Sequence, residues 1–259
     1  MTRDIWIQPW TEWYAPPFRC PTCGKGDLSL IPKSLIHQET AKSRRAHHDE
    51  DWSYQDVDFR FTARLKCSHG SCGDEAVVLG KGWIEEQMTQ EGWEPTNRFL
   101  PDCIMPMPDM ISISQRSPAP VALELRMCFQ LFWLDRASAA NRIRTAIERI
   151  MDHFRVPARQ RTKKGKIENL SLHGRLERFE KTDKTIADRL MAMKWLGNTG
   201  SHQSEKVTRE DILDALELLE DALVELFERR THHLAALTRG LLQRHRPGKR
   251  RQSVQRKNP

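Results

Sequence analysis

The sequence of 259 residues predicts an α+β protein, in which a small N-terminal β module built around a metal site precedes an all-α bundle of about five helices. Three observations predict this class. Four cysteines form two pairs in the first third of the chain, and the residues before the second pair alternate between apolar and polar. After Pro120 prolines become rare, and apolar residues recur every three or four positions, as in amphipathic helices.

The cysteine pairs are Cys20 with Cys23 and Cys67 with Cys72. A CxxC turn directs two thiolates at one point, and two such turns complete the four-sulfur shell of a structural Zn²⁺ site. We therefore expect Zn²⁺ bound by these four cysteines, although His69 could replace one thiolate. The alternative is that they are unrelated cysteines of a reducing cytosol, since the gap between the pairs is long and the second turn is wider.

The second cysteine pair lies between two predicted strands. Residues 58–66 place Phe59, Phe61, Ala63 and Leu65 on one face of a strand, and residues 76–79 predict the returning strand. A metal-binding turn at the tip of a hairpin is how a zinc ribbon is built, so the module is predicted to be zinc-ribbon-like. The polar residues 39–51 predict an exposed loop within it.

Five helical stretches are predicted, at residues 121–134, 137–154, 167–179, 186–196 and 208–228. In the last one Thr208 and Asp211 form a predicted capping pair. Between the fourth and fifth helices, Gly197 is a typical helix stop. The predicted organisation is a β module at 1–100, a linker with five prolines at 101–120, the bundle at 121–238 and a basic tail at 239–259.

The formal net charge of +7 is concentrated in the tail. Eight of the 42 Lys and Arg residues and no acidic residue lie in 239–259, which leaves 34 basic against 35 acidic residues elsewhere. Such a segment is predicted to be disordered and to attract nucleic acid, RNA or DNA, without reading its sequence. A solubilising terminus is the alternative. The candidate contacts are Arg244, Arg246, Lys249, Arg250, Arg251, Arg256 and Lys257.

The helical part resembles a known family in three places: residues 140–148 (ANRIRTAIE), residues 196–202 (LGNTGSH) and the acidic final helix. Over residues 121–230 it is similar to the family called domain of unknown function 4145, a branch of the HEPN superfamily that is also attached to type I restriction subunits. The resemblance implies an HEPN-like bundle, a homodimer formed through that bundle, and a prokaryotic, defence-associated setting.

Active HEPN ribonucleases pair an Arg and a polar residue with a later His, and they cleave RNA without a metal. The resemblance therefore implies Asn198 and His202 as candidate catalytic residues. Gly197 occupies the place of the usual Arg, and Lys194 and Arg189 are too far upstream, so Arg142 or Arg144 would have to supply the cation. The missing cation favours a largely non-catalytic protein that binds nucleic acid or a partner, with a metal-independent endoribonuclease using His202 as the alternative.

Several other classes find no support in the sequence. It contains no P-loop, GxSxG, HExxH or GxGxxG motif. No opening segment is typical of a signal peptide and no run approaches the roughly 20 apolar residues of a membrane span. We therefore expect a cytoplasmic protein without a membrane partner.

Overall fold

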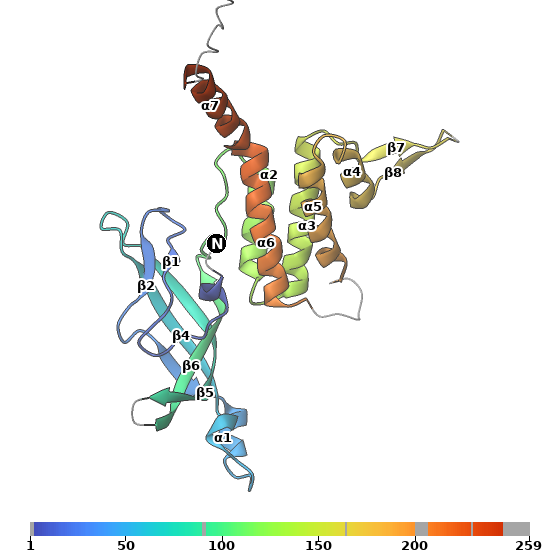
Figure 1. Ribbon diagram of the computed structural model, residues 1–259. Helices are drawn as coiled ribbons and strands as arrows, with labels where there is room; N and C mark the ends of the chain where they lie inside the picture. The colour runs from blue at the N-terminus through green and yellow to red at the C-terminus, as the bar shows by residue number, and fades with distance from the viewer. Residues whose placement is uncertain (1–2, 90–91, 164, 200–206, 229, 246–259) are drawn as a thin grey trace, which may run out of the picture.

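The computed structural model describes residues 3–89, 92–163, 165–199, 207–228 and 230–245. The N-terminal part is a curled antiparallel sheet, a half-barrel, and the C-terminal part is helical, so the fold is an α+β mix (Figure 1). The strands of the sheet are β1 (Phe18–Arg19), β2 (Asp27–Leu30), β3 (Ile36–Glu39), β4 (Asp58–Cys67), β5 (Glu75–Thr89) and β6 (Gly92–Met105).

The predicted fold class is wrong in its N-terminal part. The described residues form not a small zinc-ribbon-like module but a six-stranded sheet of order β1-β2-β4-β5-β6, with β3 pairing beside β2 along the same edge of β4. The predicted hairpin is present as β4 and β5, yet β5 continues to Thr89 and then pairs with β6. Sequence patterning missed β6 because Pro95 and Pro101 lie inside it, and proline normally argues against a strand.

Two glycines explain why the sheet curls. A Cβ atom on Gly80 would lie 2.3 Å from the carbonyl oxygen of Leu100, and one on Gly82 would lie 2.6 Å from that of Arg98. The register of β5 against β6 also shifts between Leu79 and Gly80, as at a β-bulge. Bulges and glycines let one strand bend sharply over its neighbour, so the sheet folds over its apolar face.

The inner face of the half-barrel is an aromatic core. The predicted alternation of β4 is confirmed, with Phe59, Phe61, Ala63 and Leu65 buried. Phe99 of β6 lies fully buried against them, with its ring centroid 5.2 Å from that of Phe61 and 6.3 Å from that of Phe59. These buried side chains hold β4, whose last residue is Cys67, against β6.

Three predicted elements of the chain differ in the structure. Residues 167–169 are not helical, because helix α4 (Leu172–Phe179) begins only after its cap Ser171. These residues form β8 (Ile167–Asn169), which pairs with β7 (Arg159–Arg161). The fourth predicted helix does not stop at Gly197, since a single glycine costs a packed helix only about 1 kcal/mol. The predicted loop at 39–51 contains a short helix capped by Thr40. The helices are α1 (Ala41–Ala46), α2 (Ala119–Leu131), α3 (Arg136–His153), α4 (Leu172–Phe179), α5 (Lys184–Thr199), α6 (Arg209–Leu223) and α7 (Arg230–His245).

Helix α3 lies at the centre of the bundle. It packs against α2, α4, α5 and α6, and its Ile143, Ile147 and Ile150 are fully buried. The predicted capping pair at the start of α6 is confirmed: the Thr208 hydroxyl accepts from the backbone N–H of Asp211, whose carboxylate accepts from that of Thr208. None of the described helices has the length and apolar character needed to cross a bilayer.

The N-terminal segment joins the sheet to the bundle. The indole N–H of Trp133, just after α2, donates to the carbonyl oxygen of Trp6 at 3.2 Å, and the two rings lie 5.9 Å apart. Trp6 also lies 5.0 Å from Phe18 of β1. Arg3 forms an ion pair with Asp214 of α6 at 2.6 Å. The two parts therefore share one continuous apolar core.

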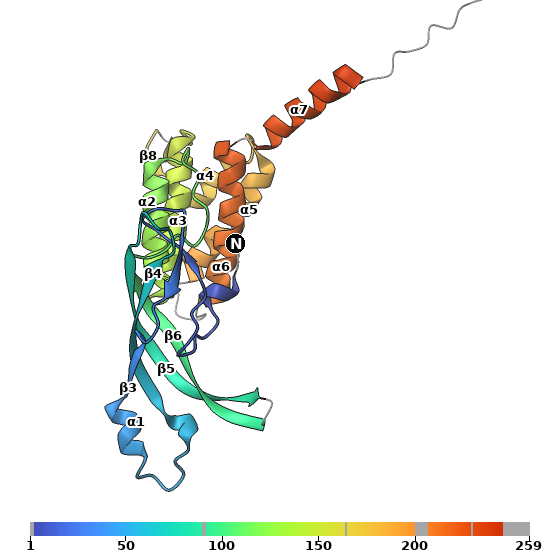
Figure 2. The same cartoon turned by 90° about the vertical axis from the view of Figure 1, so that its left-hand side faces the viewer.

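Two arms project from the body on the same side (Figure 2). The hairpin arm comprises residues 84–89 and 92–97, where β5 and β6 pair with each other and β4 no longer pairs with β5. The helical arm is α7, which follows the π-helical segment Val224–Glu228 and among the described elements packs mainly on it.

Candidate metal centre

Four cysteines from two segments of the chain meet at one end of the curled sheet. Cys20 and Cys23 lie in the turn between β1 and β2, Cys67 is the last residue of β4, and Cys72 lies in the loop that leads to β5. Strand β2 brings the two segments together, because its Leu28 pairs with Cys67.

Glycines shape the first cysteine turn. Gly24 has φ of +62°, in the left-handed region that other residues adopt with strain. Gly26 leaves room for the second pair, since a Cβ atom there would lie 2.6 Å from the Cys67 sulfur. The close approach of the two segments therefore depends on the absence of a side chain at position 26.

The distances between the sulfur atoms suit a tetrahedral metal. The sulfurs of Cys20 and Cys72 are 3.9 Å apart, those of Cys23 and Cys67 are 3.7 Å apart, and all four lie within 4.8 Å of one another. A tetrahedron with metal–sulfur bonds of about 2.3 Å has sulfur–sulfur edges of about 3.8 Å. The four cysteines could therefore hold a metal ion.

Backbone N–H groups point at two of the sulfurs. Those of Gly26 and Lys25 lie 3.5 and 3.4 Å from the Cys23 sulfur, and they lower the pKa of Cys23 to about 6. Burial instead raises the pKa of Cys67 to about 12, despite the N–H of His69 at 3.4 Å. A cation would favour the thiolate at both positions, because metal binding deprotonates coordinating thiols.

Histidine is not needed to complete the cluster. The ring of His69 lies within hydrogen-bonding distance of the Ser71 hydroxyl, at 3.0 Å from its Nδ1, while Cys67 and Cys72 both point into the cluster. Among the described residues, this is the only group of three or more Cys, His, Asp or Glu side chains close enough to share an ion.

The predicted catalytic side chains, Asn198 and His202, lie outside the described part of the chain. Asn198 belongs to the last turn of α5, but its side chain lies outside the described part of the chain, as does the whole of His202. Both candidate cations on α3 form ion pairs. The Arg142 guanidinium lies 3.1 Å from the buried carboxylate of Glu124, and that of Arg144 lies 3.5 Å from the carboxylate of Glu148.

The predicted nucleic-acid contacts lie at the end of the chain. Arg244 is exposed in the last turn of α7, and its Nε donates to the Gly240 carbonyl oxygen at 3.2 Å. The other predicted contacts, Arg246, Lys249, Arg250, Arg251, Arg256 and Lys257, lie outside the described residues.

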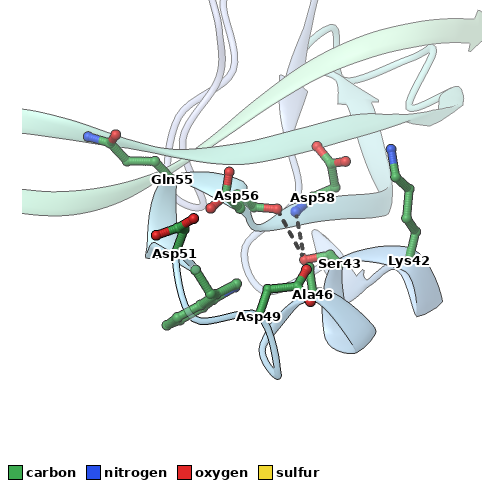
Figure 3. A pocket seen from close by; sticks show the side chains of 9 residues that line it. Lys42, Ser43, Ala46, Asp49, Asp51, Gln55, Asp56 and Asp58 are labelled. Atoms are coloured by element: carbon green, nitrogen blue, oxygen red, sulfur yellow. Dashed lines mark hydrogen bonds between the residues drawn. The ribbon is translucent and has the colours of Figure 1, made fainter.

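Sequence patterning missed a polar cavity of about 720 Å³ beside α1 (Figure 3). At its inner edge the Ser43 hydroxyl accepts from the backbone N–H of Asp58 at 3.2 Å and lies 3.4 Å from the carbonyl oxygen of Asp56. Trp52 lines one side, with its ring 4.4 Å from that of His47. The signal that could have revealed the local fold is Thr40, a typical helix N-cap. The charged residues lining the cavity are Lys42, Asp49, Asp51, Asp56 and Asp58.

Fold and site together define an α+β protein with a four-cysteine cluster on a half-barrel that is joined to a helical bundle. Residues 127–244 match the model of a family described as a domain of unknown function, DUF4145. This match agrees with the resemblance noted in the sequence, but its description names no superfamily, so an HEPN-like nature is not shown. Residues 8–107, which include all four cysteines, match a second domain of unknown function, DUF8608. No curated protein and no solved structure matches the chain.

Proposed function

We propose that the protein is a zinc-stabilised binding protein that contacts nucleic acid through its basic C-terminal tail, and that its helical bundle is not catalytic. The observation that carries the zinc site of this proposal is the convergence of four cysteine sulfurs within 4.8 Å. Four thiolates prefer Zn²⁺ to the oxygen-seeking Mg²⁺ and Ca²⁺. They also fill a tetrahedral shell, so this zinc would have a structural role, with no position open for substrate.

The ligand is proposed from the distribution of charge. The tail at 239–259 carries eight Lys or Arg residues and no carboxylate, while the rest of the chain is nearly neutral. A cationic segment binds phosphate backbones by releasing counterions, which needs no folded pocket. Phosphate backbones are therefore the ligand that this tail fits best.

The ion pairs of Arg142 and Arg144 support the proposal that the bundle is not catalytic. An Arg that stabilises a phosphoryl transition state must direct uncompensated positive charge at the reacting group. Arg142 faces the carboxylate of Glu124, which is 8% exposed, and Arg144 faces that of Glu148. Each cation is thus offset by a neighbouring anion of the same bundle.

Deleting residues 244–259 is expected to weaken nucleic-acid binding to the same extent for all sequences, because the tail contacts phosphates alone. The slope of log affinity against log salt should also become shallower, by about 0.9 for each duplex phosphate that the tail no longer neutralises. Fluorescence anisotropy with unrelated RNA and DNA oligonucleotides at several salt concentrations measures both effects. Unchanged affinity and slope would show that the tail serves solubility instead.

The bundle is expected to cleave no RNA in a manner that depends on His202. The test incubates purified protein and its His202→Ala variant with a mixed RNA pool in excess chelator. Equal background with both proteins supports the binding function. Chelator-resistant cleavage that leaves cyclic-phosphate ends and vanishes with His202→Ala would establish a metal-independent endoribonuclease, and disappearance of the same activity with Arg142→Ala or Arg144→Ala would identify its cation.

A further inference from the structure

The two projecting arms carry exposed apolar side chains. On the hairpin arm Met88 and Trp93 are cross-strand partners near the tip, with 62% and 66% of their surfaces exposed. On α7 the side chains of Leu237, Leu241 and Leu242 are between 47% and 61% exposed. Large apolar side chains that gather on a projecting element are typical of interaction surfaces.

The arms have opposite charge. The described part of the hairpin arm contains Glu85, Glu86 and Glu94, all exposed, and no Lys or Arg. Glu86 shares the face of Met88, while Glu85 on the other face pairs with Arg98 at 2.9 Å. Helix α7 contains Arg230, Arg239 and Arg244, three histidines and no acidic residue. Pairing α7 with another α7 would bring like charges together, whereas pairing α7 with a hairpin arm would bring opposite charges together.

The directions of the arms allow both contacts to form at once. In Figure 2 the hairpin arm and α7 leave the body toward the same side, one below and one above. They point away from each other within one chain, so one molecule does not pair its own arms. A second copy rotated by 180° on that side would present its α7 beside the hairpin arm of the first copy, and its hairpin arm beside the α7 of the first.

We infer that the occupant of each arm is a second copy of this chain, in an antiparallel two-fold dimer where α7 of one protomer packs on the Met88–Trp93 face of the hairpin arm of the other. The contact occurs twice in such a dimer. Each contact therefore needs to bury only about 800 Å² in total for the dimer to reach the size of a standard stable interface.

The experiment measures mass by sedimentation on the nuclease-treated full chain and on two double variants. Leu237→Glu with Leu241→Glu alters α7, and Met88→Ser with Trp93→Ser alters the hairpin arm. Leu79→Glu is the matched control, because Leu79 is also apolar and 49% exposed but lies on neither arm. The wild type and the control should form dimers, while each double variant should raise the dimer dissociation constant at least about tenfold. Far-ultraviolet circular dichroism checks that the variants keep their helices and strands.

Mixing the two double variants gives the sharpest test. In a heterodimer, the intact α7 of the hairpin variant meets the intact hairpin arm of the α7 variant, so one of the two contacts is restored. In a homodimer of either variant, both contacts are altered. Heterodimers should therefore form at concentrations where each variant alone is monomeric. Failure of the mixture to associate would overturn the inference. So would a monomeric wild type, a dimer that resists the hairpin variant but not the α7 variant, or a dimer that disappears with nuclease treatment.

Discussion

Replacing Cys67 with serine is expected to abolish the proposed zinc binding and to destabilise the sheet by about 4–5 kcal/mol or more, because loss of a bound metal is one of the few changes that cost a protein this much. Cys67 ends β4 and pairs with Leu28, so a metal held by its thiolate would be attached to the central strand. Without its thiolate, β1 and β2 would lose the bridge that ties them to the loop before β5. Elemental analysis of purified protein and urea unfolding followed by tryptophan fluorescence measure the two effects.

Cys103→Ser is the matched control for this experiment. Cys103 lies on the same sheet, in β6, and is partly buried, but it does not belong to the cysteine cluster. This variant should keep one zinc per chain and nearly all of its stability. Wild-type protein without zinc, or a Cys67→Ser protein with unchanged metal content and unfolding midpoint, would contradict the structural role of the metal.

Replacing Phe99 with alanine is expected to lower the free energy of unfolding by about 3–5 kcal/mol, as for other large aromatic side chains removed from a core. Phe99 is fully buried, and its ring contacts those of His37, Phe59 and Phe61. Its backbone N–H and carbonyl also form both hydrogen bonds of the bridge to Trp10. Truncating the side chain leaves a cavity where three strands meet the N-terminal segment.

Leu79→Ala provides the comparison for Phe99→Ala. Leu79 lies on the outer face of the sheet and is half exposed, so its truncation should cost well under 1 kcal/mol. Urea unfolding of both variants gives the difference directly. A decrease below about 1 kcal/mol for Phe99→Ala would mean that the curled sheet is not held by this aromatic core.

The sequence predicts those parts of the fold where a local pattern decides the structure. Strand β4 was predictable because its burial alternates strictly from Asp58 to Cys67, and the cap at Thr208 because its partner lies three residues on. The cysteine cluster was predictable as two paired spacings, although the sulfur distances needed the structure.

The parts that were missed depend on contacts between distant residues. The curl of the sheet depends on Gly80 lying under Leu100, twenty residues away, and on a bulge that no local pattern reveals. The cavity beside α1 forms because Ser43 approaches the backbone of Asp56 and Asp58. The predicted site at Asn198 and His202 stays a prediction.

The bond between Trp133 and Trp6 affects how this chain can be divided into fragments. A fragment cut at the bounds of the C-terminal family match, residues 127–244, would begin inside α2 and would lack the fully buried Val121 and Leu125. It would also lack Trp6, which covers Trp133, and so expose a wide apolar surface to water. The segment defined by sequence similarity is thus smaller than the packed unit, and a soluble fragment would have to include all of α2, the N-terminal segment that covers Trp133 and therefore the sheet that lies between them in the sequence.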